Sequence, residues 1–355
     1  MIIRAFITHK IGEYFADCQD RFSVSKDTKS IAVSDGMGST WQQKIWAELL
    51  VESFTNNPEW NPDINSVKLL SPIWRNRVQE FIQKLKDDDA DQSIIIRNER
   101  NFAEGYSAGA TFVGIRFTNN NWNGFVLGDS CLIKWDGNEA KFFTSQEVDS
   151  FNCFPDYFDS NDAKDGIGTI KEISGELNEG NYVFLVSDPF SNFLLEHNKK
   201  GDISSYVNSL LRLNSHEEFE NLVSEWRAMG MDDDDATLVV VEYDSNSDFS
   251  IPAIDDISLL IKVEKETLEL QQNKDLDHSE VRDNSENSID NPSHQISNME
   301  LKNDALSVSA TVDEQHSASN EDKVILFNQI SNGIKELVRN KCLQKMLISL
   351  IKKIM

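Results

Sequence analysis

The chain is poor in the features that mark secreted or membrane proteins. Its four cysteines include no C-x-x-C pair, which argues against structural zinc and favours reduced thiols. No apolar run reaches the roughly 18–20 residues that span a bilayer. The first ten residues, MIIRAFITHK, lack the long apolar segment and small-residue cleavage site of a secretory signal. These absences predict a cytoplasmic protein.

Basic residues are also scarce. The sequence has 34 Lys and Arg against 60 Asp and Glu, a formal net charge of −26. Non-specific nucleic-acid binding depends on neutralising phosphates, so we expect no nucleic-acid partner. The same charge argues against broad attachment to an anionic membrane.

Composition divides the chain into three parts. Residues 1–244 alternate between strand-like and helix-like patterns. Residues 245–322 are mostly polar and acidic, and from about residue 266 they contain too few apolar side chains to offset the entropy of folding. We therefore predict a largely disordered linker there. Residues 323–355 regain helical spacing and are predicted to form a basic amphipathic helix.

The basic C-terminal segment has several possible roles. Lys323–Met355 contains seven basic residues and one acidic residue, so its charge is opposite to that of the rest of the chain. It could dock on the acidic domain, bind a protein partner, or lie on a membrane surface. We favour the protein partner, followed by the membrane surface.

Hydrophobic periodicity within residues 1–244 predicts a mixed fold. Expected strands cover residues 1–8, 20–24, 29–34, 110–117, 122–127, 131–135, 140–143, 182–187 and 236–243. Expected helices cover residues 40–54, 67–85 with a break at Pro72, 190–197, 203–213 and 217–229. The polar stretch 144–180 is expected to be irregular.

One short stretch carries recognisable chemistry. Ile31–Ser34 is typical of a buried strand, and it is followed directly by Asp35-Gly36-Met37-Gly38. A carboxylate at a strand end, beside an unhindered backbone carbonyl, offers the oxygen ligands that Mg²⁺ and Mn²⁺ prefer. Alone, the pattern is more typical of a tight strand-to-helix turn.

Four further aspartates share that context beside strands. The full set is Asp20, Asp35, Asp129, Asp188 and Asp234. Each could be a turn residue that accepts hydrogen bonds from local backbone N–H groups. Gathered in one place, however, carboxylates repel one another unless a cation offsets them. Their recurrence at the strand ends of one domain therefore favours a shared metal cleft.

The ordered set of motifs resembles the metal-dependent protein Ser/Thr phosphatase family, type 2C or PPM, in its bacterial form. The family pattern is an early acidic pair, then D-G-x-G, G-x-T, G-D-S, S-D-G and D-N-x-T. This chain offers Gln19-Asp20, Asp35-Gly36-Met37-Gly38, Gly109-Ala110-Thr111, Gly128-Asp129-Ser130, Ser187-Asp188 and Asp234-Asp235-Ala236-Thr237. No single motif is specific, but six in this order are strong evidence over residues 1–244.

The resemblance implies a fold and a reaction. The fold would be α+β, a four-layer α-β-β-α sandwich of two antiparallel sheets flanked by helices. The activity would be hydrolysis of phosphoserine and phosphothreonine in protein substrates. Two Mn²⁺ or Mg²⁺ ions about 3.5–4 Å apart would activate a bridging water and clamp the phosphate. No nucleophilic side chain would be required.

The family's residue roles carry over onto matching positions. Asp35 would bridge the two ions, and the Gly36 carbonyl would bind one of them. Asp188 and Asp234 would complete the shell of the second ion. Asp20 would hold metal-bound waters, and Asp129 matches the position that helps to bind a weaker third ion in bacterial members.

Three positions depart from the family pattern. Phe15 stands where an Arg commonly grips the substrate phosphate, and Arg21 is the candidate substitute. Pro189 replaces the usual Gly after Asp188, and Met37 stands where many eukaryotic members have His. Bacterial members often have Met there.

Two functional hypotheses follow. The favoured one is an active Mn²⁺- or Mg²⁺-dependent phosphatase that reverses the action of a Ser/Thr kinase. The alternative is a catalytically weak relative that binds phosphoproteins or a kinase as a regulatory module. Phe15 and Pro189 favour the second hypothesis, whereas the retained Asp35, Asp188 and Asp234 favour the first.

Overall fold

The computed structural model describes residues 1–146, 155–161, 169–254 and 257–267. The predicted C-terminal helix at 323–355, and the predicted linker beyond residue 267, lie outside these residues. Among the described residues, none of the helices combines the length and the apolar character needed to cross a membrane.

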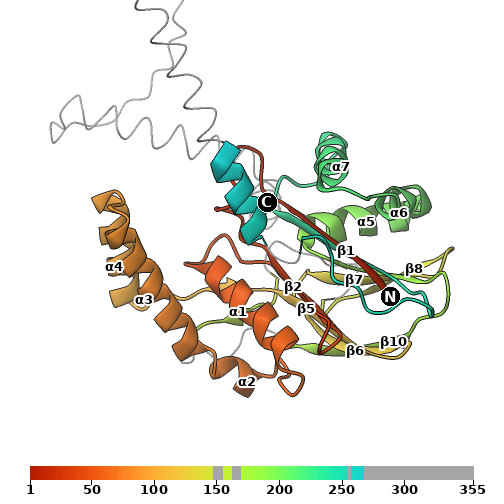
Figure 1. Ribbon diagram of the computed structural model, residues 1–355, viewed down its shortest axis with the longest axis horizontal. Coiled ribbons are helices and arrows are strands. Elements are labelled where there is room, and N and C mark those ends of the chain that lie inside the picture. Colours follow the sequence, from red (N-terminus) through yellow and green to blue (C-terminus); the bar gives the residue numbers. More distant parts are fainter. Residues whose placement is uncertain (147–154, 162–168, 255–256, 268–355) are drawn as a thin grey trace, which may run out of the picture. The chain divides into compact units, whose positions relative to one another are not determined.

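Two five-stranded antiparallel sheets form the centre of the fold (Figure 1). The first sheet has the order β1-β12-β11-β7-β8, made of Ile2–Thr8, Ala236–Glu242, Tyr182–Val186, Cys131–Trp135 and Ala140–Phe143. The second has the order β10-β6-β5-β3-β2, made of Lys171–Glu176, Asn121–Leu127, Phe112–Thr118, Ser30–Ser34 and Arg21–Ser25. A small ladder pairs β4 (Gly109–Ala110) with β9 (Phe158–Asp159).

Helices cover the outer face of each sheet. One apolar cluster joins the first sheet to α5 (Asp188–Lys200), α6 (Ile203–Leu211) and α7 (His216–Ala228). Another joins the second sheet to α1 (Gln43–Asn56), α2 (Ile64–Lys68) and α3 (Ser71–Asp87), with α4 (Gln92–Ala103) beside α3. The predicted α+β sandwich with the layer order α-β-β-α is confirmed.

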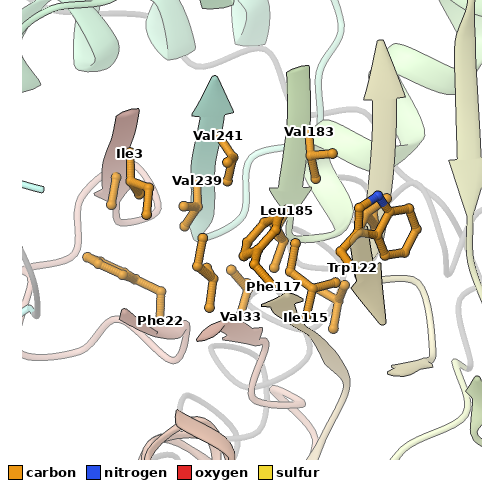
Figure 2. Packing of buried hydrophobic residues seen from close by; sticks show 14 of the residues in the cluster. Ile3, Phe22, Val33, Ile115, Phe117, Trp122, Val183, Leu185, Val239 and Val241 are labelled. Atoms are coloured by element: carbon orange, nitrogen blue, oxygen red, sulfur yellow. The ribbon is translucent and has the colours of Figure 1, made fainter. Parts of the chain in front are cut away.

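The largest core lies between the two sheets (Figure 2). Val33, Ile115 and Trp122 from the second sheet pack with Val183, Leu185 and Val239 from the first. Because the first sheet is covered on both faces, β12 is buried at nearly every position. This explains why its sequence is a continuous apolar run instead of an alternating one.

The structure adds elements that periodicity did not predict. Helix α4 and strand β10 were both missed, and β10 lies within the stretch expected to be irregular. The predicted helix at 67–85 is divided into α2 and α3, and Pro72 lies in the first turn of α3, where its missing N–H costs nothing.

The packed part of the chain extends past Asp244, where we predicted the domain to end. Phe249 and Ile257 are buried in the core between the sheets. Residues 258–267 form a further helix, drawn in cyan in Figure 1, and its Leu260 and Ile261 pack against the same core. The part of the predicted linker before residue 268 therefore includes packed segments of the domain.

Candidate metal centre

Two of the predicted aspartates lie side by side at one end of the second sheet. Asp20 immediately precedes β2 and Asp35 immediately follows β3. These strands pair antiparallel, with Arg21 opposite Ser34, so the ladder brings the two aspartates to the same end. The predicted strand ends at this hairpin are thus correct to within one residue.

The other three aspartates lie at one end of the first sheet. Strand β11 pairs with β7 through Val186 and Cys131, and with β12 through Val186 and Leu238. Asp188 follows β11, Asp129 precedes β7, and Asp234 precedes β12. Antiparallel pairing therefore places all three at the same end of this sheet.

Hydrogen bonds connect the aspartate-bearing end of the first sheet with that of the second sheet. The Thr237 hydroxyl donates to Oδ2 of Asp20 over 2.8 Å, which links β12 to the start of β2. The Thr111 backbone N–H donates to the Asp35 carbonyl over 2.9 Å, and its hydroxyl lies 2.6 Å from that of Ser130. The G-x-T and G-D-S motifs thus meet beside Asp35.

The cluster is partly buried, and Asp20 and Asp129 are its most buried members. Asp20 has no exposed surface and Asp129 is 6% exposed. Burial, and next the charge of Asp235, raise the pKa of Asp20 to about 7, although hydrogen bonds from Thr237 and Ser187 oppose the shift. Burial also raises the pKa of Asp129 to about 7. These carboxylates therefore lie where their charged forms are poorly stabilised by protein alone.

The remaining two inner carboxylates show the same effect. Burial, and then the charge of Asp20, raise the pKa of Asp35 well above its ordinary range. Burial, and then the charge of Asp129, do the same to the pKa of Asp188. Asp234 contributes repulsion to both of these carboxylates.

The donor set fits a hard divalent cation. Oδ1 of Asp20, of Asp129 and of Asp188 are each buried with no hydrogen-bond partner. Such orphaned acceptors are costly unless something positive binds them. In the part of the chain that the structure describes, no three His, Cys, Asp or Glu side chains already have the arrangement of a metal site. The observation that points to a cation is therefore that these buried oxygens have no hydrogen-bond donor.

Three glycines allow the backbone to pack tightly at the cluster. A Cβ on Gly36 would come within 3.0 Å of the Gln19 carbonyl, next to Asp20. Gly128 has a φ of +88°, and a Cβ there would lie 2.6 Å from the Asp156 carbonyl. A Cβ on Gly109 would meet the Tyr157 ring. Segment 155–161, which the sequence did not connect to the site, therefore packs against its loops.

The predicted phosphate ligand Arg21 faces its own backbone. Its Nη1 donates to the carbonyls of Cys18 and Asp20, over 2.9 and 2.6 Å, and the residue is buried. The guanidinium holds the loop that leads into β2, an arrangement that speaks against phosphate binding. Arg21 as a phosphate ligand stays a prediction with no support from these contacts.

Phe15, at the position of the family's arginine, belongs to the core between the sheets. Its ring lies edge-on to His9, with centroids 4.8 Å apart, and near His216. The Phe15 backbone N–H donates to Oε2 of Glu264, in the helix at 258–267, over 2.9 Å. The side chain that replaces the arginine therefore serves packing.

Two residues at the cluster were not predicted as site residues. Lys10 Nζ lies 2.9 Å from Oδ1 of Asp234. Asp235, only 2% exposed, accepts from the backbone N–H of Lys10 through Oδ1 and from that of Gln19 through Oδ2. Asp235 thereby ties together both ends of the loop that precedes Asp20. The sequence did contain a signal for Asp235, because Asp234-Asp235 stands where the family motif has Asp-Asn.

The pairing also affects Lys10. Burial lowers the pKa of Lys10, but the charge and hydrogen bond of Asp234, and the charge of Asp235, outweigh burial and raise it overall. The ammonium group is therefore held in its charged form at the rim of the carboxylate cluster.

A comparison with protein families identifies this architecture. The sequence profile of the family described as Protein phosphatase 2C matches residues 16–227, more than half of the chain. The chain belongs to the protein phosphatase 2C family. The match spans five of the six predicted motifs completely and ends before Asp234. The predicted family is confirmed, and the family is metal-dependent.

Solved structures of bacterial phosphatases are similar to this 2C-family chain. A bacterial serine phosphatase shares 12% identity, with 70% of this chain and 99% of that chain covered and a TM-score of 0.46. The S. agalactiae serine/threonine phosphatase shares 16% identity, with 68% of this chain and 100% of that chain covered and a TM-score of 0.44. The catalytic domain of PstP, in complex with two manganese ions, shares 17% identity over 67% and 96%, with a TM-score of 0.41. No curated protein matches the sequence.

The other two departures from the 2C pattern are accommodated locally. Pro189 lies in the first turn of α5, where a fixed φ suits the helix and no N–H is needed. Met37 donates its backbone N–H to the Gly109 carbonyl over 3.0 Å, which anchors the D-G-x-G turn on β4. Neither residue disturbs the strand ends that carry the aspartates.

Proposed function

We propose that this chain is an active protein serine/threonine phosphatase that depends on two Mn²⁺ or Mg²⁺ ions. The observation that carries the proposal is the group of buried aspartates with orphaned oxygens, at the shared end of both sheets. Burial of that much like charge is unfavourable without a cation, and the family is one that uses such cations.

The roles of the individual residues are proposed as follows. Asp35, the Gly36 carbonyl, Asp188 and Asp234 would hold the ions, and Asp129 would contribute to a third. When bound, the ions would lower the pKa of a water, which makes it a better nucleophile toward phosphorus, and would supply positive charge for the phosphate oxygens. Asp20, fixed by Thr237, would orient that water as an acceptor of its hydrogen bond.

The substrates would be phosphoproteins, with a Ser/Thr kinase as the opposing enzyme. The alternative function is a pseudophosphatase that binds phosphoproteins or a kinase. One observation favours it. Phe15, at the position of the family's arginine, has no guanidinium and is packed in the core. The guanidinium of Arg21 is already bound to backbone carbonyls. The retained aspartates favour the enzyme.

The test is metal-dependent hydrolysis of an aryl phosphate and of a phosphothreonine peptide. Wild type should turn over both with millimolar Mn²⁺, and Asp35→Ala should lose at least about a thousandfold, since it removes a bridging metal ligand. Asp136→Ala is the matched control, because Asp136 accepts hydrogen bonds in an exposed turn. Absence of turnover in folded wild type, shown by circular dichroism, would leave the binding-module alternative.

A further inference from the structure

The proposed reaction needs a positive group for the substrate phosphate, and the usual arginine is absent. Four described cations lie around the loop before Asp20 and the turn before β12: Lys10, Arg21, Lys44 and Arg227. Their contacts differ in a way that separates one of them from the rest.

Three of these cations bind backbone carbonyls. Arg21 donates to Cys18 and Asp20, and Lys44 Nζ donates to the Ala16 carbonyl over 2.8 Å. Arg227 Nη2 donates to the carbonyls of His9 and Asp234, over 3.0 and 2.6 Å. These groups hold loops in place, so reaching a substrate would break the scaffold around the aspartates.

The side chain of Lys10 instead contacts a carboxylate of the cluster. Its Nζ lies 2.9 Å from Oδ1 of Asp234, and its backbone N–H is fixed by Asp235. The Lys10 and Asp234 side chains are 24% and 43% exposed, whereas Asp20 and Asp129 are almost fully buried. The ion pair is therefore more accessible to solvent than Asp20 and Asp129.

We propose that Lys10 binds a phosphate oxygen of the substrate and so replaces the missing arginine; the inference rests on the function proposed above. An ammonium has three N–H donors, and Asp234 accepts one of them. The others can donate to a phosphate beside Asp234. A lysine binds phosphate as a point charge and lacks the two-pronged geometry of arginine, so it selects less for orientation.

The test measures phosphate binding and metal binding separately. Inorganic phosphate is titrated into the full-length Mn²⁺-loaded protein by calorimetry, and Mn²⁺ into the metal-free protein. The KM for an aryl phosphate is measured alongside. Variants are Lys10→Met, which keeps the apolar stem, and Lys10→Arg. Lys86→Met is the matched control, because Lys86 pairs with Glu99 over 2.6 Å on α3 and α4.

Lys10→Met should weaken phosphate binding and raise KM by about tenfold, as expected for one charge-assisted hydrogen bond at a partly exposed site. Mn²⁺ affinity should not fall, because Asp234 loses only a competing partner. Lys10→Arg should recover most of the phosphate affinity, and Lys86→Met should match wild type.

The inference is overturned if Lys10→Met binds phosphate like wild type, or if phosphate affinity falls only in step with Mn²⁺ affinity or thermal stability. It is also overturned if the wild type binds no phosphate. Lys10-dependent phosphate binding without any turnover would refute the proposed function and support this inference. Turnover by Lys10→Met with the KM of the wild type would support the proposed function and refute this inference.

Discussion

The core between the sheets and the carboxylate cluster at their end are built on the same strands. Strand β3 supplies Val33 to the core and leads directly into Asp35. Strand β11 supplies Leu185 and leads into Asp188, and Asp234 stands just ahead of the strand that carries Val239. Within two to five residues, each of these strands passes from apolar packing to a carboxylate of the cluster.

The two regions have opposite effects on stability. Every fully buried side chain in the core removes apolar surface from water, which stabilises the fold. The cluster buries carboxylates whose oxygens lack partners, which destabilises it in the absence of metal. A rigid core close by allows the fold to hold this unfavourable arrangement in place.

The largest expected effect comes from the core. Leu185→Ala should lower the free energy of unfolding by about 2–5 kcal/mol, because Leu185 has no exposed surface and its removal leaves a cavity. Denaturant unfolding measures this, with Leu259→Ala, at a half-exposed position, as the control. Equal stability of Leu185→Ala and Leu259→Ala would contradict the stabilising role given to the core between the sheets.

The pH dependence of the metal-free protein comes next. The pKa of Asp20 and of Asp129 rises from 3.8 to about 7 on folding. The folded state therefore binds more protons than the unfolded state between about pH 4 and 7, and stability falls as pH rises through that window. We expect the thermal midpoint of the metal-free protein to fall as the pH rises from about 4 to 7. Saturating Mn²⁺ should make the thermal midpoint less dependent on pH. A midpoint that does not change with pH in the metal-free protein would contradict the raised pKa values of Asp20 and Asp129.

Neutralising one carboxylate should give a smaller gain. Asp129→Asn should stabilise the metal-free protein at pH 8 by about 1–3 kcal/mol, because it removes a buried charge from a repulsive group. The same variant should weaken Mn²⁺ binding. Chemical denaturation with and without Mn²⁺ checks both signs, and destabilisation under both conditions would show that Asp129 is a structural residue.

The smallest effect concerns the helix at 258–267. Glu264→Ala should cost about 1 kcal/mol, because it removes the acceptor for the Phe15 N–H and the partner of His9, 3.6 Å away. Glu266→Ala, on the exposed side of the helix, is the control. Equal thermal midpoints for the two variants would mean that the Glu264 contact contributes nothing.

The strands and the five aspartates were predictable because each signal is local. A β-branched run that stops at an Asp marks a strand end, and antiparallel pairing then gathers such ends. Helix α4 was missed because Ile94, Ile95 and Ile96 are consecutive and so do not show helical spacing in the sequence. Only Ile95 of the three is buried. Strand β10 is an edge strand with mostly exposed side chains, and it resembles a polar loop.

The contacts that complete the site could not be predicted, because they join distant segments. Lys10 and Asp234 lie more than two hundred residues apart, as do Phe15 and Glu264. Nothing in the composition near Lys10 distinguishes it from a surface lysine. The packed segment beyond residue 244 was missed for the same reason, since Ile257 finds its apolar neighbours on strands far away in the sequence.

The position of β1 bears on how the protein is made on the ribosome. Among the strands that the structure describes, β1 pairs only with β12, from Ile2 opposite Glu242 to Thr8 opposite Ala236. Because β12 follows β1 by more than two hundred residues, β1 must wait for β12 to be synthesised before the two can pair, and pairing over such a separation is slow. Thr237, which anchors Asp20, arrives with that last strand. The five aspartates would thus come together only when nearly the whole domain has been translated, so shorter chains would carry Asp20 without its anchor on β12.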